Sequence, residues 1–297
     1  MENYIQMIEY LFFRLIIEVF RFVPFFLLYL MADITALLMK ILGYRRKVIE
    51  QNLKNSFPEK SEKELTKIKN KFYLNLADIL LESIKGYTLS KKQFEKRYTV
   101  ENPEVDIKYY NEGKNVIYAG GHFGNWEWGT QASPFVLKHK VVILYKPLKN
   151  KYIDRFIKKK RERFGVKMVS INITARSFVN QLEPFCVIML ADQNPSNRKK
   201  AIWVNFLNRP TPVLQGVEVY AKLKNTPVLF FNTYRVKRGY YKIKLFPLTD
   251  RPRELPKGQI TKLFMQRLEA EIKKYPYMWL WSHKRWKYPP DKDTIIY

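Results

Sequence analysis

The feature that most constrains the fold is a regular alternation of β-like and helical segments between residues 116 and 274. Short apolar runs, of the kind that form buried strands, are separated by longer segments with apolar residues at helical spacing. The predicted strands are Val116 to Ala119, Val141 to Tyr145, Lys167 to Ile171, Phe185 to Leu190, Ile202 to Phe206, Val228 to Tyr234 and Tyr240 to Phe246. The predicted helices are Tyr152 to Phe164, Thr174 to Leu182, Val213 to Leu223 and Gln259 to Lys274. This alternation predicts a single α/β domain in which a mixed sheet is flanked by helices.

Two candidate catalytic residues, His122 and Glu127, lie where the first predicted strand ends. The segment from Tyr118 to Gly129 reads YAGGHFGNWEWG. Its glycines predict a tight loop, and Asn125 is the expected N-cap of the next helix, which places Glu127 in the first helical turn. Residues five apart on one helix point about 140° away from each other, so His122 and Glu127 can meet only if the loop folds back.

If the two side chains meet, the carboxylate fixes the tautomer of His122 and raises its basicity. The imidazole then becomes a general base for a hydroxyl group. The backbone N–H groups around Phe123, Gly124 and Asn125 are expected to stabilise an oxyanion. A histidine near a glutamate is more often structural than catalytic, but a glycine loop between a strand and a helix favours a site.

The sequence offers no candidate nucleophile for covalent catalysis. It contains no G-x-S-x-G elbow, and its single cysteine, Cys186, lies inside an apolar run. With three scattered histidines and one cysteine, no metal site is expected. A general base without a protein nucleophile predicts direct acyl transfer, with no cofactor and with the acyl group arriving as a thioester.

The segment GGHFGNWEWG resembles the H-x4-D/E block of the glycerolipid acyltransferase superfamily, in its branch of bacterial lipid A late acyltransferases. Other blocks of that branch are matched in the same order: YRRKVIEQNLKNSFPEKS from Tyr44, YKPLKNKYID from Tyr145, LADQNP from Leu190, VNFLNRPTP from Val204 and YPYMWLWSHKRWK from Tyr275. The similarity covers roughly residues 40 to 290. The chain departs from many relatives at Leu207-Asn208-Arg209, where they carry a Gly-Arg pair, and at Lys146, where arginine is common.

The resemblance implies an acyltransferase at the cytoplasmic face of the inner membrane. It would move a fatty acyl chain from an acyl carrier protein or coenzyme A thioester to a hydroxyl of a lipid A precursor. An aminolipid or a lysophospholipid is the alternative acceptor. A non-catalytic, basic protein that binds a membrane surface or nucleic acid is the alternative from another class.

Four further residues, Lys146, Asp192, Gln193 and Arg209, are candidate substrate-binding residues because each follows a predicted strand. Reactive loops in α/β sheets gather at strand ends, so these side chains are expected to converge near His122. Lys146 or Arg209 would bind a phosphate of the acceptor or help to stabilise the oxyanion. The alternative is that each caps a strand end or pairs with a surface acid.

The charge of the chain is unevenly distributed. The formal net charge is +27, yet residues 1 to 40 carry three basic and four acidic side chains. A basic body behind an apolar leader suits an anionic membrane surface, a phosphorylated lipid acceptor and an acidic carrier protein. A merely lysine-rich solvated surface is the alternative. Nucleic acid is not expected, because no helix-turn-helix, zinc-finger or RNP signature is present.

Residues 1–43 are predicted to form a membrane-associating helical leader, and residues 44–297 the acyltransferase domain. The longest uncharged run of the leader, Phe22 to Ala32, is shorter than the roughly 20 residues that a membrane span needs. Arg14, Glu18 and Arg21 share one helical face, which favours a helix lying in the membrane interface. A true span and a helix packed on the body are the alternatives. Pro24 is expected to kink or restart the helix.

The remaining segments are predicted from local signals. Residues 45–89 are expected to be helical, with a capping box at Ser61 and Glu64. Gln93 to Gly113 is expected to be a connecting segment. In the tail, Trp279 and Trp281 alternate in a way that fits a strand packed on the core, with an interfacial aromatic belt as the alternative.

Overall fold

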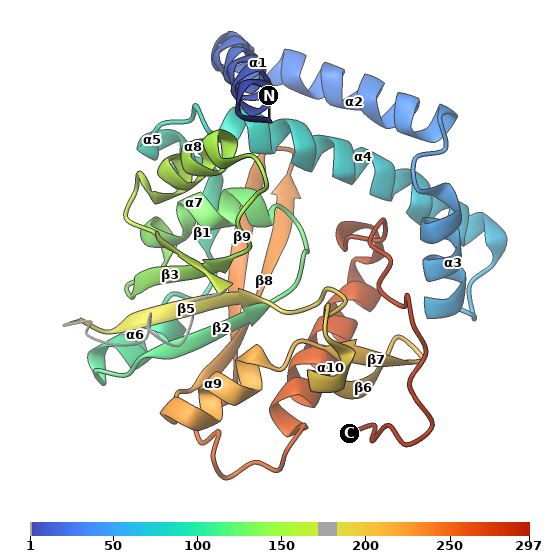
Figure 1. The fold of residues 1–297 in the computed structure, drawn as a ribbon, viewed down its shortest axis with the longest axis vertical. Coiled ribbons are helices and arrows are strands. Elements are labelled where there is room, and N and C mark those ends of the chain that lie inside the picture. The colour runs from blue at the N-terminus through green and yellow to red at the C-terminus, as the bar shows by residue number, and fades with distance from the viewer. Residues whose placement is uncertain (1, 172–182) are drawn as a thin grey trace.

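The computed structural model describes residues 2–171 and 183–297, and these form one α/β domain around a seven-stranded sheet (Figure 1). The strand order is β1-β9-β8-β2-β5-β3-β4. The strands are β1 (Tyr98–Val100), β2 (Val116–Gly120), β3 (Lys140–Tyr145), β4 (Lys167–Ser170), β5 (Phe185–Leu190), β8 (Val228–Lys237) and β9 (Tyr240–Thr249). Neighbouring strands are parallel except for the β8–β9 hairpin. The predicted mixed sheet is therefore confirmed.

Helices cover both faces of the sheet (Figure 1). They are α1 (Glu2–Phe22), α2 (Phe25–Ile41), α3 (Arg46–Ser56), α4 (Glu62–Gly86), α5 (Lys91–Arg97), α6 (Glu104–Asn111), α7 (Trp126–Val136), α8 (Lys151–Glu162), α9 (Gly216–Lys224) and α10 (Gln259–Lys274). Alternate residues of a strand point to opposite faces, and β2 shows this directly. Its Ile117 and Ala119 pack in the core cluster that contains α10, whereas Val116 and Tyr118 pack in the cluster that contains α7.

The chain between residues 93 and 113 is not the simple connection that we expected. It contains the end of α5, the strand β1 and the helix α6. A capping box formed by Ser90 and Gln93 starts α5, and β1 is stabilised by parallel pairing with β9. The strand is short, and its partner lies far along the sequence, so local pattern alone did not indicate it.

A second difference lies in the block from Val204. The predicted helix from Val213 begins later, as α9, because residues up to Val213 form β7 (Arg209–Val213). This strand pairs with β6 (Ile202–Phe206) in a separate two-stranded sheet. The predicted helix from Thr174 to Leu182 lies outside the described residues.

Other local predictions are confirmed. Ser61 and Glu64 form the capping box that starts α4. Trp279 and Trp281 are 2% and 0% exposed, so the core interpretation of the tail is correct, although neither residue lies in a named strand. Cys186 is buried in β5.

The leader forms two helices that lie across α4, and they are separated at Pro24 as predicted (Figure 1). Ala32 and Ala36 of α2 are buried and pack against Ala77 of α4. Lys85 of α4 donates hydrogen bonds to the carbonyl oxygens of Phe20, Arg21 and Val23, at 2.8 to 2.9 Å, and so holds the end of α1.

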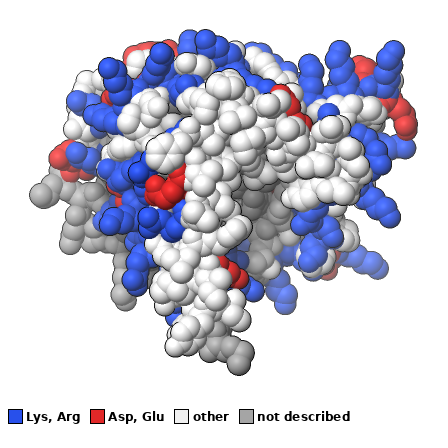
Figure 2. All heavy atoms as spheres, turned by 90° about the horizontal axis from the view of Figure 1, so that it is seen from above, with Lys and Arg blue, Asp and Glu red and all other residues white. Residues whose placement is uncertain are grey.

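The outer face of these two helices is apolar and exposed. Its exposed residues are Ile8, Leu11, Phe12, Leu15, Val19, Phe22, Phe26, Leu30, Ile34, Leu37, Leu38 and Ile41. Seen from above, an uncharged band is bordered by lysine and arginine side chains (Figure 2). Among the described helices, none meets by itself the length and hydropathy required to cross a bilayer; α2 and α3 meet them only together, with an 87° bend between them.

Candidate active site

The parallel pairing of β2 with β5 brings His122 and Asp192 together. The register places Gly120 opposite Leu190, so the residues two positions beyond each strand face one another at the carboxyl edge of the sheet. Nδ1 of His122 lies 2.6 Å from Oδ1 of Asp192, and the backbone N–H of His122 donates to Oδ2 at 2.8 Å. The indole N–H of Trp279 also donates to Oδ2, at 2.8 Å.

The tautomer of His122 follows from this contact. An ionised carboxylate can only accept hydrogen bonds, so Nδ1 carries the proton of the neutral ring and Nε2 carries the lone pair. The side-chain amide of Gln193 lies 3.2 Å from Nε2, where it can donate to that lone pair. The imidazole side chain is 17% exposed, so Nε2 is the basic atom at an accessible site.

Electrostatics favour the ionic form of the pair. Burial alone lowers the pKa of His122, but the charge and the hydrogen bond of Asp192, with a smaller effect of Glu127, raise it above its ordinary value. Burial alone raises the pKa of Asp192, but the His122 charge and the hydrogen bonds from His122 and Trp279 lower it to about 2. Asp192 is therefore ionised and acts only as an acceptor at neutral pH.

Glu127 does not hold His122 as the sequence suggested. It lies in the first turn of α7, as predicted, but its Oε2 accepts a hydrogen bond from Nη2 of Arg161 on α8 at 2.7 Å. The prediction that Glu127 fixes the imidazole is therefore wrong, and Asp192, predicted to bind substrate, takes that place. The helix directs the Glu127 side chain towards α8, and the neighbouring parallel strand supplies the carboxylate instead.

Glu82 of α4 supports the loop that carries His122. Asn125 caps α7 by accepting from the backbone N–H of Trp128, which confirms the predicted N-cap. The amide of Asn125 donates to Oε2 of Glu82 at 2.6 Å, and the hydroxyl groups of Tyr241 and Tyr29 donate to the same carboxylate. Because Tyr29 lies on α2, this network connects the leader to the start of α7.

The backbone of the loop is tightly confined at Gly124. Its φ angle is +59°, and an added Cβ would lie 2.3 Å from the carbonyl oxygen of Thr233. The N–H of Gly124 donates to the carbonyl oxygen of Met278, and the N–H of Phe123 donates to that of Gly121. The prediction that these two N–H groups receive an oxyanion is therefore wrong. Phe123 and Asn125 were predicted to line the substrate site. Their side chains are buried instead, so neither lines it.

A cleft opens beside His122, between α4, α7, α8 and the end of β3. Trp126, whose ring centroid lies 5.3 Å from that of His122, forms part of its wall. The cleft has about 860 Å³ of empty space, part of it open solvent. Its apolar lining residues are Leu76, Ile79, Leu80, Trp126, Leu148, Ile157 and Met168. Its charged lining residues are Glu127, Lys146, Asp154, Lys158 and Arg161.

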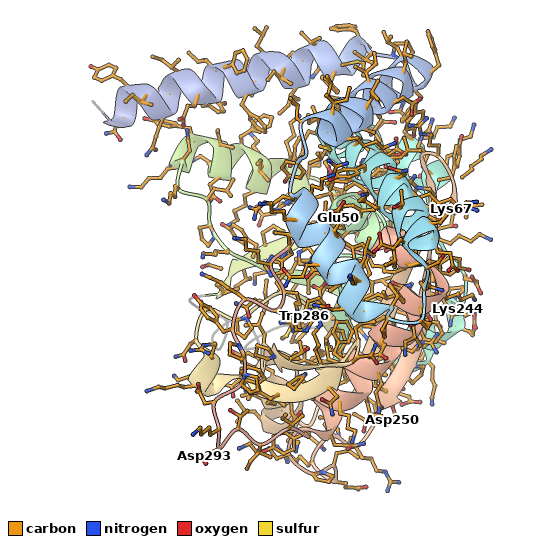
Figure 3. All side chains as sticks on the ribbon, turned by 90° about the vertical axis from the view of Figure 1, so that its right-hand side faces the viewer. Glu50, Lys67, Lys244, Asp250, Trp286 and Asp293 are labelled. Atoms are coloured by element: carbon orange, nitrogen blue, oxygen red, sulfur yellow. The ribbon has the colours of Figure 1, made fainter. Side chains whose placement is uncertain are left out.

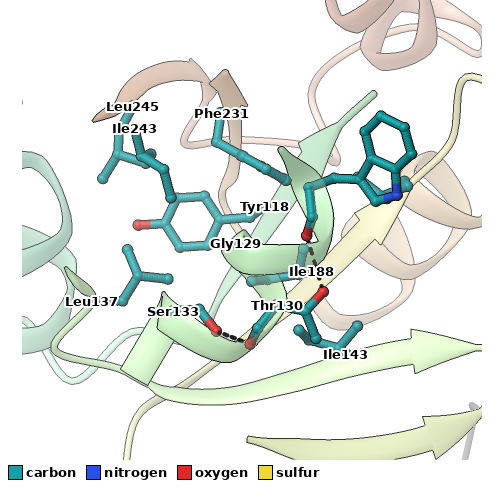
Figure 4. Close-up of a pocket in the computed structure, with 12 residues that line it drawn as sticks. Tyr118, Gly129, Thr130, Ser133, Leu137, Ile143, Ile188, Phe231, Ile243 and Leu245 are labelled. Atoms are coloured by element: carbon teal, nitrogen blue, oxygen red, sulfur yellow. Dashed lines mark hydrogen bonds between the residues drawn. The ribbon is translucent and has the colours of Figure 1, made fainter. Parts of the chain in front are cut away.

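A second cavity lies between α7 and the sheet, and it shares Trp126 with the cleft (Figure 4). It has about 470 Å³ of empty space, part of it open solvent, of which only about 40 Å³ is accessible to a water molecule. Its lining is mainly apolar residues of β2, β3, β5, β8 and β9, including Ile143, Ile188 and Leu245. The hydroxyl groups of Thr130 and Ser133 donate to carbonyl oxygens of α7, so they leave no unmatched donor in the cavity.

The expected convergence of the strand-end residues occurs in part. Gln193 contacts His122, and Lys146 lines the cleft. Arg209 instead donates to Asn52 and Ser56 of α3, and its guanidinium lies 3.4 Å from the ring centroid of Trp286. The hairpin of β6 and β7 turns Arg209 towards α3, so its contacts are structural.

The sequence also left several contributors to the site unassigned. Arg161 and Trp126 line the cleft, Trp279 binds Asp192, and Glu82 supports the loop. Of these, Trp126 and Trp279 lie in the blocks GGHFGNWEWG and YPYMWLWSHKRWK, which could have indicated them, whereas the contacts of Arg161 and Glu82 depend on how the helices pack. Within the described residues, no three His, Cys, Asp or Glu side chains gather as a metal site would require.

Together, the fold and the site define an α/β protein with a histidine–carboxylate pair of the kind that general-base enzymes use. Comparison with known proteins narrows this class. Residues 3–288 match the family model described as bacterial lipid A biosynthesis acyltransferase. The chain belongs to that family, as the sequence blocks suggested, and is therefore an acyltransferase.

Three relatives are distant in sequence but match over most of their length. A Haemophilus influenzae protein named lipid A biosynthesis acyltransferase is 23% identical over 239 residues, which cover 78% of this chain and 72% of the relative. A second protein of that name from the same organism is 24% identical over 259 residues, which cover 86% of this chain and 82% of the relative. The lipid A biosynthesis lauroyltransferase of Escherichia coli is 22% identical, with 86% and 83% covered.

Proposed function

We propose that this protein transfers a fatty acyl chain from a thioester donor to a hydroxyl of a lipid A precursor, with His122 as the general base. The observation that carries the mechanism is the 2.6 Å contact between His122 and Asp192, which places the lone pair of the neutral imidazole on Nε2. Family membership supports the reaction class, and the names of the relatives support the acceptor.

The reaction needs one base and one acid, and His122 can serve as both. Nε2 takes the proton of the acceptor hydroxyl as its oxygen attacks the thioester carbonyl carbon. The tetrahedral intermediate then collapses, the C–S bond breaks, and the leaving sulfur receives the proton from Nε2. Asp192 stabilises the imidazolium between the two steps. Lys146 supplies positive charge along the cleft, where the oxyanion and the phosphates of the acceptor are negative, whereas Arg161 is paired with Glu127.

The cavities suit a lipid reaction. In this proposal the cleft admits the acceptor and the thioester, and the apolar cavity under α7 widens to receive the acyl chain. The two meet at Trp126, next to His122. The donor is an acyl carrier protein or coenzyme A. Both donors are anionic, which suits the basic residues Lys146 and Lys158 on the cleft wall.

We further propose that the protein acts at the cytoplasmic face of the inner membrane. The exposed apolar face of α1 and α2 would lie in the membrane interface, with the cleft close to the lipid. The contact of Asn150, at the start of α8, with Gln6 and Glu9 of α1 supports this arrangement, because it joins the wall of the cleft to the leader.

The decisive experiment is mass spectrometry of the lipids of a strain that lacks the gene, complemented with the wild type or with His122→Ala. The proposal expects a lipid A that lacks one secondary acyl chain and is restored only by the wild type. An unchanged lipid A with another lipid altered would replace the acceptor but keep the chemistry. No lipid change, or full restoration by His122→Ala, would overturn the mechanism.

A further inference from the structure

A groove lined by lysines lies between α2 and α4, and we call it the lysine groove. Its basic residues are Lys40 of α2 and Lys63, Lys67 and Lys71 of α4, and its remaining lining residues are Asp33, Ala36, Leu37, Thr66, Asn70 and Leu74. It has about 1040 Å³ of empty space, part of it open solvent. The three lysines of α4 are four residues apart, so they share one face of the helix. Figure 3 labels Lys67 on α4.

The charge of the lysine groove is not balanced by the protein. Its single carboxylate, Asp33, is paired with Arg238 at 2.6 Å. Within the part of the chain that the structure describes, no ion pair joins Lys40, Lys63, Lys67 or Lys71 to a carboxylate. Like charges four residues apart on a helix destabilise it slightly, so this arrangement favours an anionic ligand.

The groove continues the exposed apolar face of the leader. Leu37 belongs to both, because it lines the groove and is 55% exposed. Its neighbours Ile34, Leu38 and Ile41 are also exposed. An apolar stripe bordered by a row of lysines is the pattern of a surface that lies at the boundary between lipid chains and headgroups.

The lysine groove is separate from the active site, although α4 contributes to both. Leu76 is the first residue of α4 that lines the cleft, and the nearest lysine of the groove, Lys71, lies five residues earlier, which is about 7.5 Å along the helix. Neither His122 nor any of the residues that line the cleft lines the groove. The groove therefore has no part in the chemistry of acyl transfer.

We propose that the lysine groove receives the phosphate-bearing headgroups of anionic membrane phospholipids. The inference rests on the proposed position of α1 and α2 in the membrane interface. The aliphatic stems of the lysines extend beside the apolar residues of α2, and the ammonium groups reach the phosphates. Each lysine near an anionic surface strengthens binding by roughly fivefold, so three of them contribute about 100-fold.

The test compares variants of the full chain in a vesicle flotation assay. The vesicles are made of phosphatidylcholine alone or of phosphatidylcholine with phosphatidylglycerol. The groove variant is Lys63→Gln/Lys67→Gln/Lys71→Gln. The matched control is Lys224→Gln/Lys257→Gln/Lys292→Gln, which removes three exposed lysines from the opposite end of the molecule, where α9 and the C-terminus lie (Figure 1). A leader variant, Leu11→Asp/Leu15→Asp, tests the apolar face itself.

The groove variant should bind vesicles with phosphatidylglycerol about 100-fold more weakly than the wild type, and should bind neutral vesicles equally well. The control variant should lose little, and added salt should remove the difference between wild type and groove variant. If the groove variant keeps the full preference for phosphatidylglycerol, the groove serves another anionic partner and the proposal is overturned. If the leader variant binds both vesicles as the wild type does, the membrane position in the proposed function is wrong as well.

Discussion

Nδ1 of His122 lies 2.6 Å from Oδ1 of Asp192, and this contact joins residues 70 positions apart in the sequence. It exists because β2 and β5 are neighbours in the sheet with a register that aligns the residues beyond their ends. The carboxylate that matters for His122 therefore comes from an adjacent strand, and Glu127, five residues away in the same motif, is used for a different contact.

The first prediction concerns Asp192. Asp192→Asn keeps the size of the side chain but removes the charge that stabilises the imidazolium and fixes Nδ1–H as the donor. We expect kcat to fall by about 100- to 10,000-fold, the range that a well-positioned base contributes. Acyl transfer measured with a thioester donor checks this, and Asp293→Asn in the exposed tail is the control. Turnover within a few-fold of wild type would show that the pair is structural.

The second prediction concerns pH. A general base works in its neutral form, so kcat/KM should rise with pH through the pKa of His122. Burial lowers that pKa, and Asp192 more than offsets this effect, so the rise should centre above the ordinary value of 6.5. In Asp192→Asn the carboxylate no longer raises the pKa of His122, while burial still lowers it. The rise of kcat/KM should therefore move to lower pH. If the rise of kcat/KM stays at the same pH in this variant, a group other than His122 controls the pH dependence.

The third prediction concerns the ion pair between Glu127 and Arg161. The side chains of Glu127 and Arg161 are 25% and 19% exposed, so this salt bridge is intermediate between a surface and a buried one. Glu127→Gln should lower the free energy of unfolding by about 1 to 3 kcal/mol, since it leaves Arg161 without its partner. Arg161→Gln should cost a similar amount, and the double variant should cost less than the sum of both. Additive losses in denaturant titration would argue against direct coupling.

The fourth prediction concerns the cavity under α7. Ile188→Phe adds volume on its wall and should shift the preference towards shorter acyl donors. Each methylene that no longer fits loses about 0.8 kcal/mol of burial, which is close to fourfold in relative kcat/KM. Competition between donors of different chain length measures this, with Ile188→Val as the control that leaves the cavity open. An unchanged chain-length preference would place the acyl chain elsewhere.

Much of the fold could be predicted from the sequence, because strong periodicity marks most elements. The helix from Gln259 to Lys274 and the strand from Phe185 to Leu190 have the predicted bounds. The strand β1 was not predicted, because three residues are too few to show a period, and its pairing with β9 is a tertiary effect.

The site was predicted less completely than the fold. His122 could be chosen because its glycine loop is a local signal, and Gln193 because it follows a strand. The role of Asp192 depends on which strand lies beside β2, and strand order cannot be predicted from local sequence patterns. The same holds for Arg161, which meets Glu127 only after α7 and α8 have packed.

The way α4 holds the leader has a practical consequence for producing this enzyme. Lys85 has the carbonyl oxygens of Phe20, Arg21 and Val23 as its acceptors, and Glu82 receives one hydrogen bond from Tyr29. A truncated protein that starts after residue 43 would lose these hydrogen bonds, would expose the apolar residues of α4 that α2 covers, such as Ala77, and would remove one contact from the network that supports the loop carrying His122. Water-soluble versions for assay or crystallisation are therefore better obtained by replacing the exposed apolar residues of α1 and α2 with polar ones than by deleting the helices.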